Sequence, residues 1–129
     1  MKPHVRISGA GCCLVDQIYP DMDFKDPGIL PYLSRTRSDG GLYPGRLVFS
    51  EEFESFSGKN LSSVVEQLTP NSLGPAYNVG GPSVVALIHA AQLLHEIDAE
   101  VNFYGSRGQD SSGVFLQSKL EQTPLNISH

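Results

Sequence analysis

Asp16 is the first residue of this chain whose type and position point to chemistry. It directly follows the apolar stretch Cys12–Val15, within the segment "GAGCCLVDQIY". A carboxylate next to apolar strand residues costs free energy unless it caps a turn or binds a polar group. In an open α/β sheet, ligands collect at the carboxyl ends of the strands. Asp16 is therefore either a turn-capping residue or a ligand-binding carboxylate.

A glycine pair, Gly80 and Gly81, comes directly before the apolar run "PSVVALIHAAQLLHEI". Pro82 stands where a helix would begin, and proline is pre-organised for the first position of a helix. The pair has two interpretations: a tight turn, or a backbone that lets a polar ligand approach the amides at the helix end. Asp16 alone or the pair alone would favour the plain structural interpretation. Together they favour a site for a polar ligand.

Two segments match known nucleotide-binding motifs only in part. Gly9-Ala10-Gly11 begins like the dinucleotide-binding G-x-G-x-x-G, but Leu14 stands at the third glycine and no helical pattern follows. The segment "SGKN" at 57–60 resembles the end of a P-loop, but Phe53 and Asn60 replace the first glycine and the final Ser/Thr. A dinucleotide-binding domain is therefore the weaker alternative, and "SGKN" is expected to be a turn.

The elements that would position these residues alternate between strand and helix. Residues 4–10 predict a first strand, and the extended chain continues through Cys12–Val15. A helix is expected from Pro82, buried on most sides, followed by a strand in "AEVNFYGSRG". A second helix is expected in "DSSGVFLQSKLEQT" with Asp110 or Ser111 as N-cap, and another strand begins in "PLNIS". This order predicts an α/β fold with a partly parallel sheet.

The middle of the chain predicts less regular structure. Glycines and prolines interrupt residues 20–45, and again residues 58–75 on either side of a short amphipathic stretch, "LSSVVEQL". Between them, "RLVFSEEFESF" places apolar residues close to strand alternation, at Leu47, Phe49 and Phe53. A strand is therefore expected in that segment.

Composition narrows the classes of protein. The chain has 129 residues, 40% of them hydrophobic, which suits one globular domain with its own core. The net charge is −5 and the nine basic residues are scattered, so the chain lacks the basic surface that nucleic-acid binding requires.

No apolar run is long enough for a membrane span and no signal core precedes the first strand, so a cytoplasmic protein without membrane contact is expected. Cys12 and Cys13 are neighbours that would face opposite ways on a strand, and they are expected to be reduced thiols.

Taken in chain order, three quoted stretches resemble the ribokinase-like (PfkB) carbohydrate and nucleoside kinases: "GAGCCLVDQIY", "NVGGPSVVALIHAAQLL" and "VNFYGSRGQDSSGVFLQSKLEQTPLN". The first carries a G-x-x-x-x-D element, Gly11 to Asp16. The second carries the pair Gly80-Gly81, and the third a G-x-D-x-x-G element, Gly108 to Gly113. The stretches cover over half of the chain, and their order is more specific than any one of them.

The resemblance implies transfer of a phosphoryl group from ATP, with Mg²⁺, to a hydroxyl of a sugar or a nucleoside-like small molecule. It implies that Asp16 hydrogen-bonds hydroxyls of this acceptor and that Gly80 and Gly81 open a buried helix beneath it. Gly11 and Val85 would lie on the substrate side. Members of the family often carry Asn at the position of Val85, so the contact made by that Asn is not expected here.

The resemblance covers only the first part of the family's domain. In that family the catalytic base belongs to a Gly-Ala-Gly-Asp element, which lies with the ATP site in the second half. Because this chain ends at His129, before either, no catalytic residue and no metal ligand is expected in it, and the chain alone is expected to be inactive. Asp110 is expected to cap a helix rather than to replace that base.

Residues 1–129 are thus expected to be the N-terminal part of a ribokinase-like domain, with a lid-like insertion within about residues 17–79. The family's lid is a small β-sheet that closes over the sugar and in many members forms a dimer contact, so a homodimer through the lid is also implied. "GRLVFSEEFESF" is the best candidate for lid strands. A second hypothesis stays open: a truncated or degenerate kinase domain, without catalysis, that binds a polar ligand or a partner. Val85 favours this alternative.

Overall fold

The computed structural model describes residues 4–127 of the chain. The chain divides into two compact units. Unit 1 comprises residues 1–18 and 77–129, and unit 2 comprises residues 19–76. Unit 2 therefore falls inside the segment where an insertion was expected.

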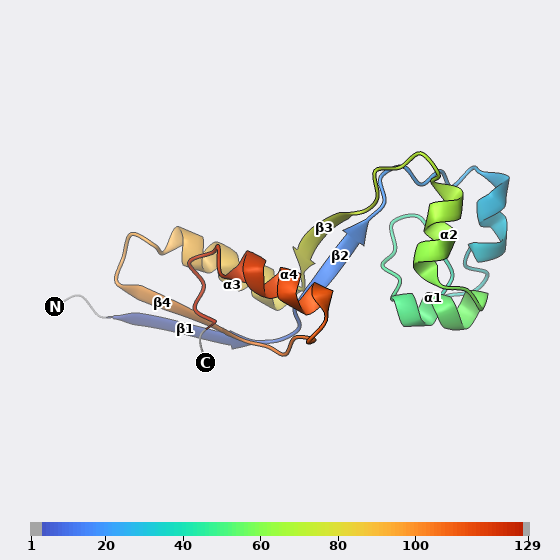
Figure 1. Ribbon diagram of the computed structural model, residues 1–129. Helices are drawn as coiled ribbons and strands as arrows, with labels where there is room; N and C mark the ends of the chain where they lie inside the picture. Colours follow the sequence, from blue (N-terminus) through green and yellow to red (C-terminus); the bar gives the residue numbers. More distant parts are fainter. Residues whose placement is uncertain (1–3, 128–129) are drawn as a thin grey trace. The chain divides into compact units, whose positions relative to one another are not determined.

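The parallel pairing that the sequence predicts is present in unit 1. Strand β1 (Val5–Ala10) pairs in parallel with β4 (Ala99–Tyr104), with Ile7 opposite Val101 (Figure 1). An isolated parallel bridge joins Asn102 to Asn126, where the expected strand in "PLNIS" begins. Ser128, the last residue of that stretch, lies outside the described residues. The α/β class is thus confirmed, with a small two-stranded parallel sheet.

A second pair of strands in the structure is antiparallel. Strand β2 (Leu14–Ile18) follows β1 closely and pairs with β3 (Ala76–Gly80), which runs in the opposite direction (Figure 1). Strand β3 leads through Gly81 directly into helix α3 (Pro82–Leu93). The carboxyl end of β3 and the start of α3 are therefore held next to β2.

One hydrophobic core holds unit 1 together. Its buried residues come from α3, from β4, from helix α4 (Ser111–Leu120) and from the segment after α4: Val84, Ala91, Val101, Phe103, Leu116, Leu120 and Leu125. Full burial of one such large side chain stabilises a fold by about 1.5–3 kcal/mol. The wide burial expected for α3 is present: Val84 and Ala91 are buried, and Val85, Leu87, Ile88 and Ala90 pack against the same core. Leu93, the last residue of the helix, is instead 83% exposed.

The helix starts follow the local signals in the sequence. Pro82 occupies the first turn of α3, as expected. Asp110 caps α4: its carboxylate accepts a hydrogen bond from the N–H of Gly113 at 2.8 Å. A side chain on Gly113 would overlap the carbonyl of Gly108, which explains the glycine at that position. Among residues 4–127, no helix is both long and apolar enough to cross a membrane.

Unit 2 is built from helices, and the strand expected over "RLVFSEEFESF" is wrong. Residues Ser50–Ser57 form helix α1, between the 3₁₀-helix η1 (Pro27–Tyr32) and helix α2 (Leu61–Leu68). The apolar residues Phe49 and Phe53 are four apart, a spacing that suits one face of a helix as well as a strand. Two glutamates in the first turn of α1 complement the helix dipole, and Gly58 ends the helix at a φ of 68°. A β-sheet lid is therefore not observed in the described residues of unit 2.

A small core of its own holds unit 2. Tyr32, Phe53 and Val64 are buried together, and the rings of Tyr32 and Phe53 are 5.9 Å apart. Lys59 Nζ donates a hydrogen bond to the Tyr32 hydroxyl at 2.9 Å. Asp39 organises the loop before α1: backbone N–H groups of Thr36, Gly41 and Arg35 donate to its carboxylate and hold its pKa well below the usual range.

The edge of unit 1 carries a pH-dependent contact. His4 Nδ1 lies 2.9 Å from Asp98 Oδ1, and its Nε2 lies 3.7 Å from Glu100 Oε2, which also accepts from Arg6. The hydrogen bond to Asp98, more than the carboxylate of Glu100, raises the pKa of His4 above 6.5. A group whose pKa is raised by folding stabilises the folded state fully below its unfolded pKa, and this contribution is lost as the pH rises through the folded pKa.

His4→Gln is therefore expected to lower the urea midpoint of unit 1 relative to the wild type at pH 5.5, and to leave little difference at pH 8.5. Urea titrations at several pH values across this range measure the effect. His89→Gln, on the exposed face of α3, is the matched control for the His-to-Gln substitution itself. A wild-type minus His4→Gln difference that stays constant with pH would exclude the charged contact.

Candidate functional site

The candidate site forms where the chain leaves the parallel sheet of unit 1. After β1 ends at Ala10, the N–H of Gly11 donates to the carbonyl of Tyr104 at 3.2 Å, which ties the turn to the carboxyl end of β4. Cys12 and Cys13 then connect the turn to β2. Because β2 pairs with β3, the turn, β2 and the start of α3 come together at this end of β1 and β4.

Asp16, on β2, is in direct contact with Gly80, the last residue of β3. A Cβ atom placed on Gly80 would overlap the carboxylate of Asp16. Asp16 is half-buried and Gly80 is buried. Two of the residues that the sequence singled out are therefore neighbours, and the absence of a side chain at position 80 is what leaves room for the carboxylate.

Gly81 has a backbone conformation and surroundings that favour glycine. Its φ is 106°, and a Cβ there would lie 2.5 Å from the carbonyl oxygen of Cys12. Gly81 is the N-cap of α3 and offers no side chain to the amides of the first turn. Those amides carry the positive end of the helix dipole and lack partners within the helix. The β1–β2 turn and the start of α3 are thus packed backbone against backbone.

Gly11 joins the same cluster through its contact with Ser83, a residue that the sequence analysis did not single out. A Cβ on Gly11 would overlap the hydroxyl oxygen of Ser83, in the first turn of α3. The glycine of the G-x-x-x-x-D element therefore leaves room for this hydroxyl, as Gly80 does for the carboxylate of Asp16. The serine directly after Pro82 was the sequence signal for a further polar group at the site. Ser83 comes close to Gly11 only because β2 pairs with β3.

Val85 follows the site in the first turn of α3, and Asp110 lies elsewhere in unit 1. The N–H of Val85 closes the first turn of α3 by donating to the carbonyl of Gly81 at 3.1 Å, while its side chain packs against the hydrophobic core. Asp110 caps α4 through Gly113. The structure thus brings together Asp16, Gly80, Gly81 and Gly11, adds Ser83, and assigns a core contact to the side chain of Val85.

These groups are suited to binding rather than to bond breaking. A half-buried carboxylate accepts hydrogen bonds from hydroxyl groups, a serine hydroxyl donates and accepts, and free helix amides donate. Within residues 4–127, no three His, Cys, Asp or Glu side chains are grouped so that they could hold a metal ion.

The chain matches no protein-family model, and no curated protein or solved structure matches it significantly. The kinase resemblance consequently rests on the three ordered sequence elements. The structure adds the contacts made by those elements within unit 1.

Proposed function

We propose that this chain is the acceptor-binding part of a ribokinase-like kinase, which transfers a phosphoryl group from ATP to a hydroxyl of a sugar or a nucleoside-like molecule. The contact of the Asp16 carboxylate with Gly80, the last residue of β3 before α3, is the observation that carries the proposal. It joins the first and second elements of the family pattern in one place. The third element, Gly108 to Gly113, forms the capped start of α4.

In this proposal Asp16 accepts a hydrogen bond from an acceptor hydroxyl and so fixes its orientation. Ser83 and the first amides of α3 are the neighbouring polar groups. Phosphoryl transfer depends mainly on positioning and on charge stabilisation, so a fixed acceptor hydroxyl is a direct contribution to rate. ATP would supply the phosphoryl group and Mg²⁺ would neutralise its charge. Both would be held by residues outside the described range. A cytoplasmic enzyme, and a homodimer through unit 2, remain parts of the proposal.

Binding of an acceptor by the chain alone tests the role of Asp16. In a calorimetric screen of pentoses, hexoses and nucleosides, at least one is expected to bind, and Asp16→Asn is expected to weaken that binding by about tenfold or more, because it removes a charged acceptor of hydrogen bonds. Asp98→Asn, at the amino end of β4, is the control and should bind as the wild type does. Equal binding by Asp16→Asn and the wild type would overturn the assignment.

Gly80→Ala tests the same contact without removing the carboxylate. The added methyl group would occupy the place of the Asp16 carboxylate, whose side chain can rotate away. We expect acceptor binding to fall as far as in Asp16→Asn, with the fold retained by circular dichroism. In the double variant Gly80→Ala/Asp16→Asn, the two losses should not add, because both act through one carboxylate. Additive losses would show that Gly80 acts independently of Asp16.

The second candidate is a domain without catalysis that binds a polar ligand or a partner. The packing of Val85 into the core favours it, because the side chain of that residue is not among the polar groups of the site. Two measurements separate the candidates. A coding sequence that continues beyond His129 into a glycine-rich Gly-Asp element at a helix start, with ATP-dependent phosphorylation of the acceptor by that protein, supports the kinase. Acceptor binding without any such continuation supports the binding domain.

A further inference from the structure

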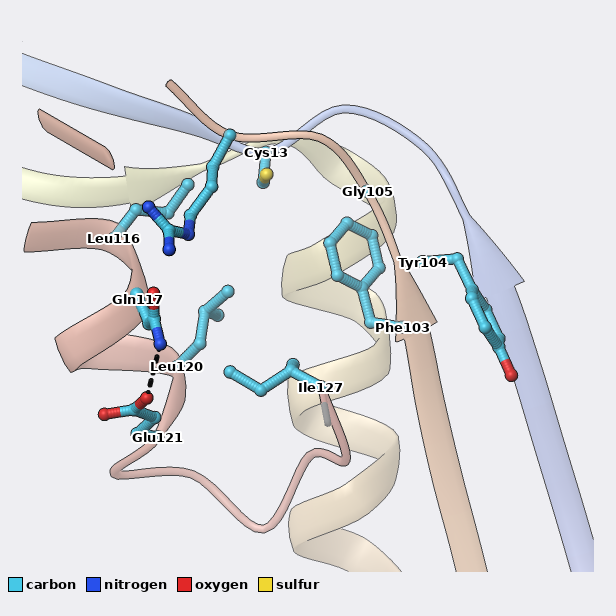
Figure 2. Close-up of a pocket in the computed structure, with 10 residues that line it drawn as sticks. Cys13, Phe103, Tyr104, Gly105, Leu116, Gln117, Leu120, Glu121 and Ile127 are labelled. Carbon is cyan, nitrogen blue, oxygen red and sulfur yellow. Dashed lines mark hydrogen bonds between the residues drawn. The ribbon is translucent and has the colours of Figure 1, made fainter. Parts of the chain in front are cut away.

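Unit 1 contains a pocket that the candidate site does not use. It has a volume of about 620 Å³ and lies beside β4, α4 and the segment after α4 (Figure 2). Phe103, Leu116 and Leu120, which are buried, and half-buried Ile127 supply its apolar lining. Pockets for small molecules are typically about 300–1,000 Å³, mostly apolar, with a few polar groups that fix orientation. This pocket has both properties, and Asp16 is not part of its lining.

The polar side chains of the pocket differ in how many hydrogen-bond donors remain available to a ligand. Figure 2 shows Gln117 on α4 and Glu121 directly after it, where Gln117 Nε2 donates to Glu121 Oε1 at 2.8 Å. Arg107 Nη1 donates to the carbonyl of Gly108 at 3.2 Å, and no carboxylate among the described residues forms an ion pair with Arg107. A guanidinium has five N–H donors and binds carboxylates through two parallel hydrogen bonds. Arg107 is therefore the cation of this pocket with donors left for a ligand.

We propose that this pocket binds a small amphiphile with one carboxylate on an aliphatic or aromatic body. The body would contact Phe103, Leu120 and Ile127, and the carboxylate would pair with Arg107. Glu121 lines the same pocket, and its charge would disfavour ligands with two or more negative charges, such as phosphate esters, because like charges in one site repel each other. The proposal is independent of the kinase assignment, since it uses none of the residues at the acceptor site.

The pair 4-phenylbutyrate and 4-phenylbutan-1-ol tests the proposal, because the two probes share the apolar body and differ in the charged group. Calorimetry with the full 129-residue chain is expected to show that the acid binds about tenfold more tightly than the alcohol, a ratio typical of a charge-assisted hydrogen bond. Arg107→Gln should remove this preference by weakening the acid about tenfold while leaving the alcohol unchanged. Glu121→Gln should bind the acid at least as tightly as the wild type.

Arg37→Gln is the matched control, because it makes the same substitution on an exposed arginine of unit 2. It should bind both probes as the wild type does. Equal affinity for acid and alcohol, equal effects of Arg107→Gln and Arg37→Gln, or no binding of either probe would each overturn the proposal. Circular dichroism of Arg107→Gln checks that unit 1 remains folded.

Cys13 provides a second readout, because it lines the pocket and is the only thiol left in a Cys12→Ser variant. Burial raises the pKa of the Cys13 thiol, which donates to the carbonyl of Ser106 at 3.3 Å, so its alkylation should be slow near neutral pH. We expect saturating 4-phenylbutyrate to slow N-ethylmaleimide labelling of this variant several-fold, and to have little effect when Arg107→Gln is added. Unchanged labelling in the presence of bound acid would place the ligand elsewhere and overturn the proposal.

Discussion

Gly81→Ala is expected to lower the free energy of unfolding of unit 1 by about 3 kcal/mol or more. Two effects combine. An alanine at a φ of 106° adopts a backbone conformation that L-residues rarely occupy, and its Cβ would lie 2.5 Å from the carbonyl oxygen of Cys12. The oxygen belongs to backbone on the β1–β2 turn, so the overlap cannot be relieved by rotating a side chain. Urea unfolding followed by circular dichroism measures the loss.

Gly45→Ala separates the two effects. Gly45 also has a positive φ, 74°, but a Cβ there would meet no atom within 4 Å. Its substitution should therefore cost only the conformational strain, about 1–2 kcal/mol. Gly45 lies in unit 2, so each variant is compared with the wild type in the unit that carries the substitution. If Gly81→Ala lowers the free energy of unfolding of unit 1 no more than Gly45→Ala lowers that of unit 2, the β1–β2 turn does not pack against the start of α3.

Phe53→Ala is expected to unfold unit 2 while unit 1 remains folded. Phe53 is fully buried in a core that it shares with Tyr32 and Val64, and removing such a ring costs about 3–5 kcal/mol. A unit this small has little stability in reserve. Hydrogen exchange read by mass spectrometry should show loss of protection in peptides from residues 19–76, with peptides from β4 and α4 unchanged.

Phe49→Ala is the control for this experiment. Phe49 precedes α1 and is 47% exposed, so its truncation should cost less than about 1 kcal/mol and leave the exchange pattern intact. If Phe53→Ala instead removed protection from β4 and α4 to the same extent, the two units would unfold as one cooperative structure. That result would contradict their description as separate compact units.

Local signals predicted the parts of the fold that depend on local interactions. Pro82 marked the start of α3 and Asp110 the start of α4, because helix starts are determined by residues within one turn. The error over residues 50–57 arose where one apolar spacing fits both a strand and a helix. The acidic first turn of α1 was the signal that could have decided between them.

The candidate site was predictable as a set of residues but not as a set of contacts. Asp16 and the glycine pair were selected from their places beside a strand and a helix. Their meeting depends on β2 pairing with β3, a contact between distant parts of the chain. For the same reason Ser83 was overlooked. The packing of the Val85 side chain against the core also depends on contacts between distant elements, and its place on the substrate side stays a prediction.

The antiparallel pairing of β2 with β3 has a further consequence for evolution. Unit 2 leaves unit 1 after β2 and returns through β3, so both of its junctions lie on neighbouring strands. A segment attached in this way can be lengthened, shortened or exchanged for another without altering the connectivity of the sheet that carries Asp16 and Gly80. Descendants of this chain could therefore acquire new accessory segments at this junction while the carboxylate and the glycine beside it stay in place.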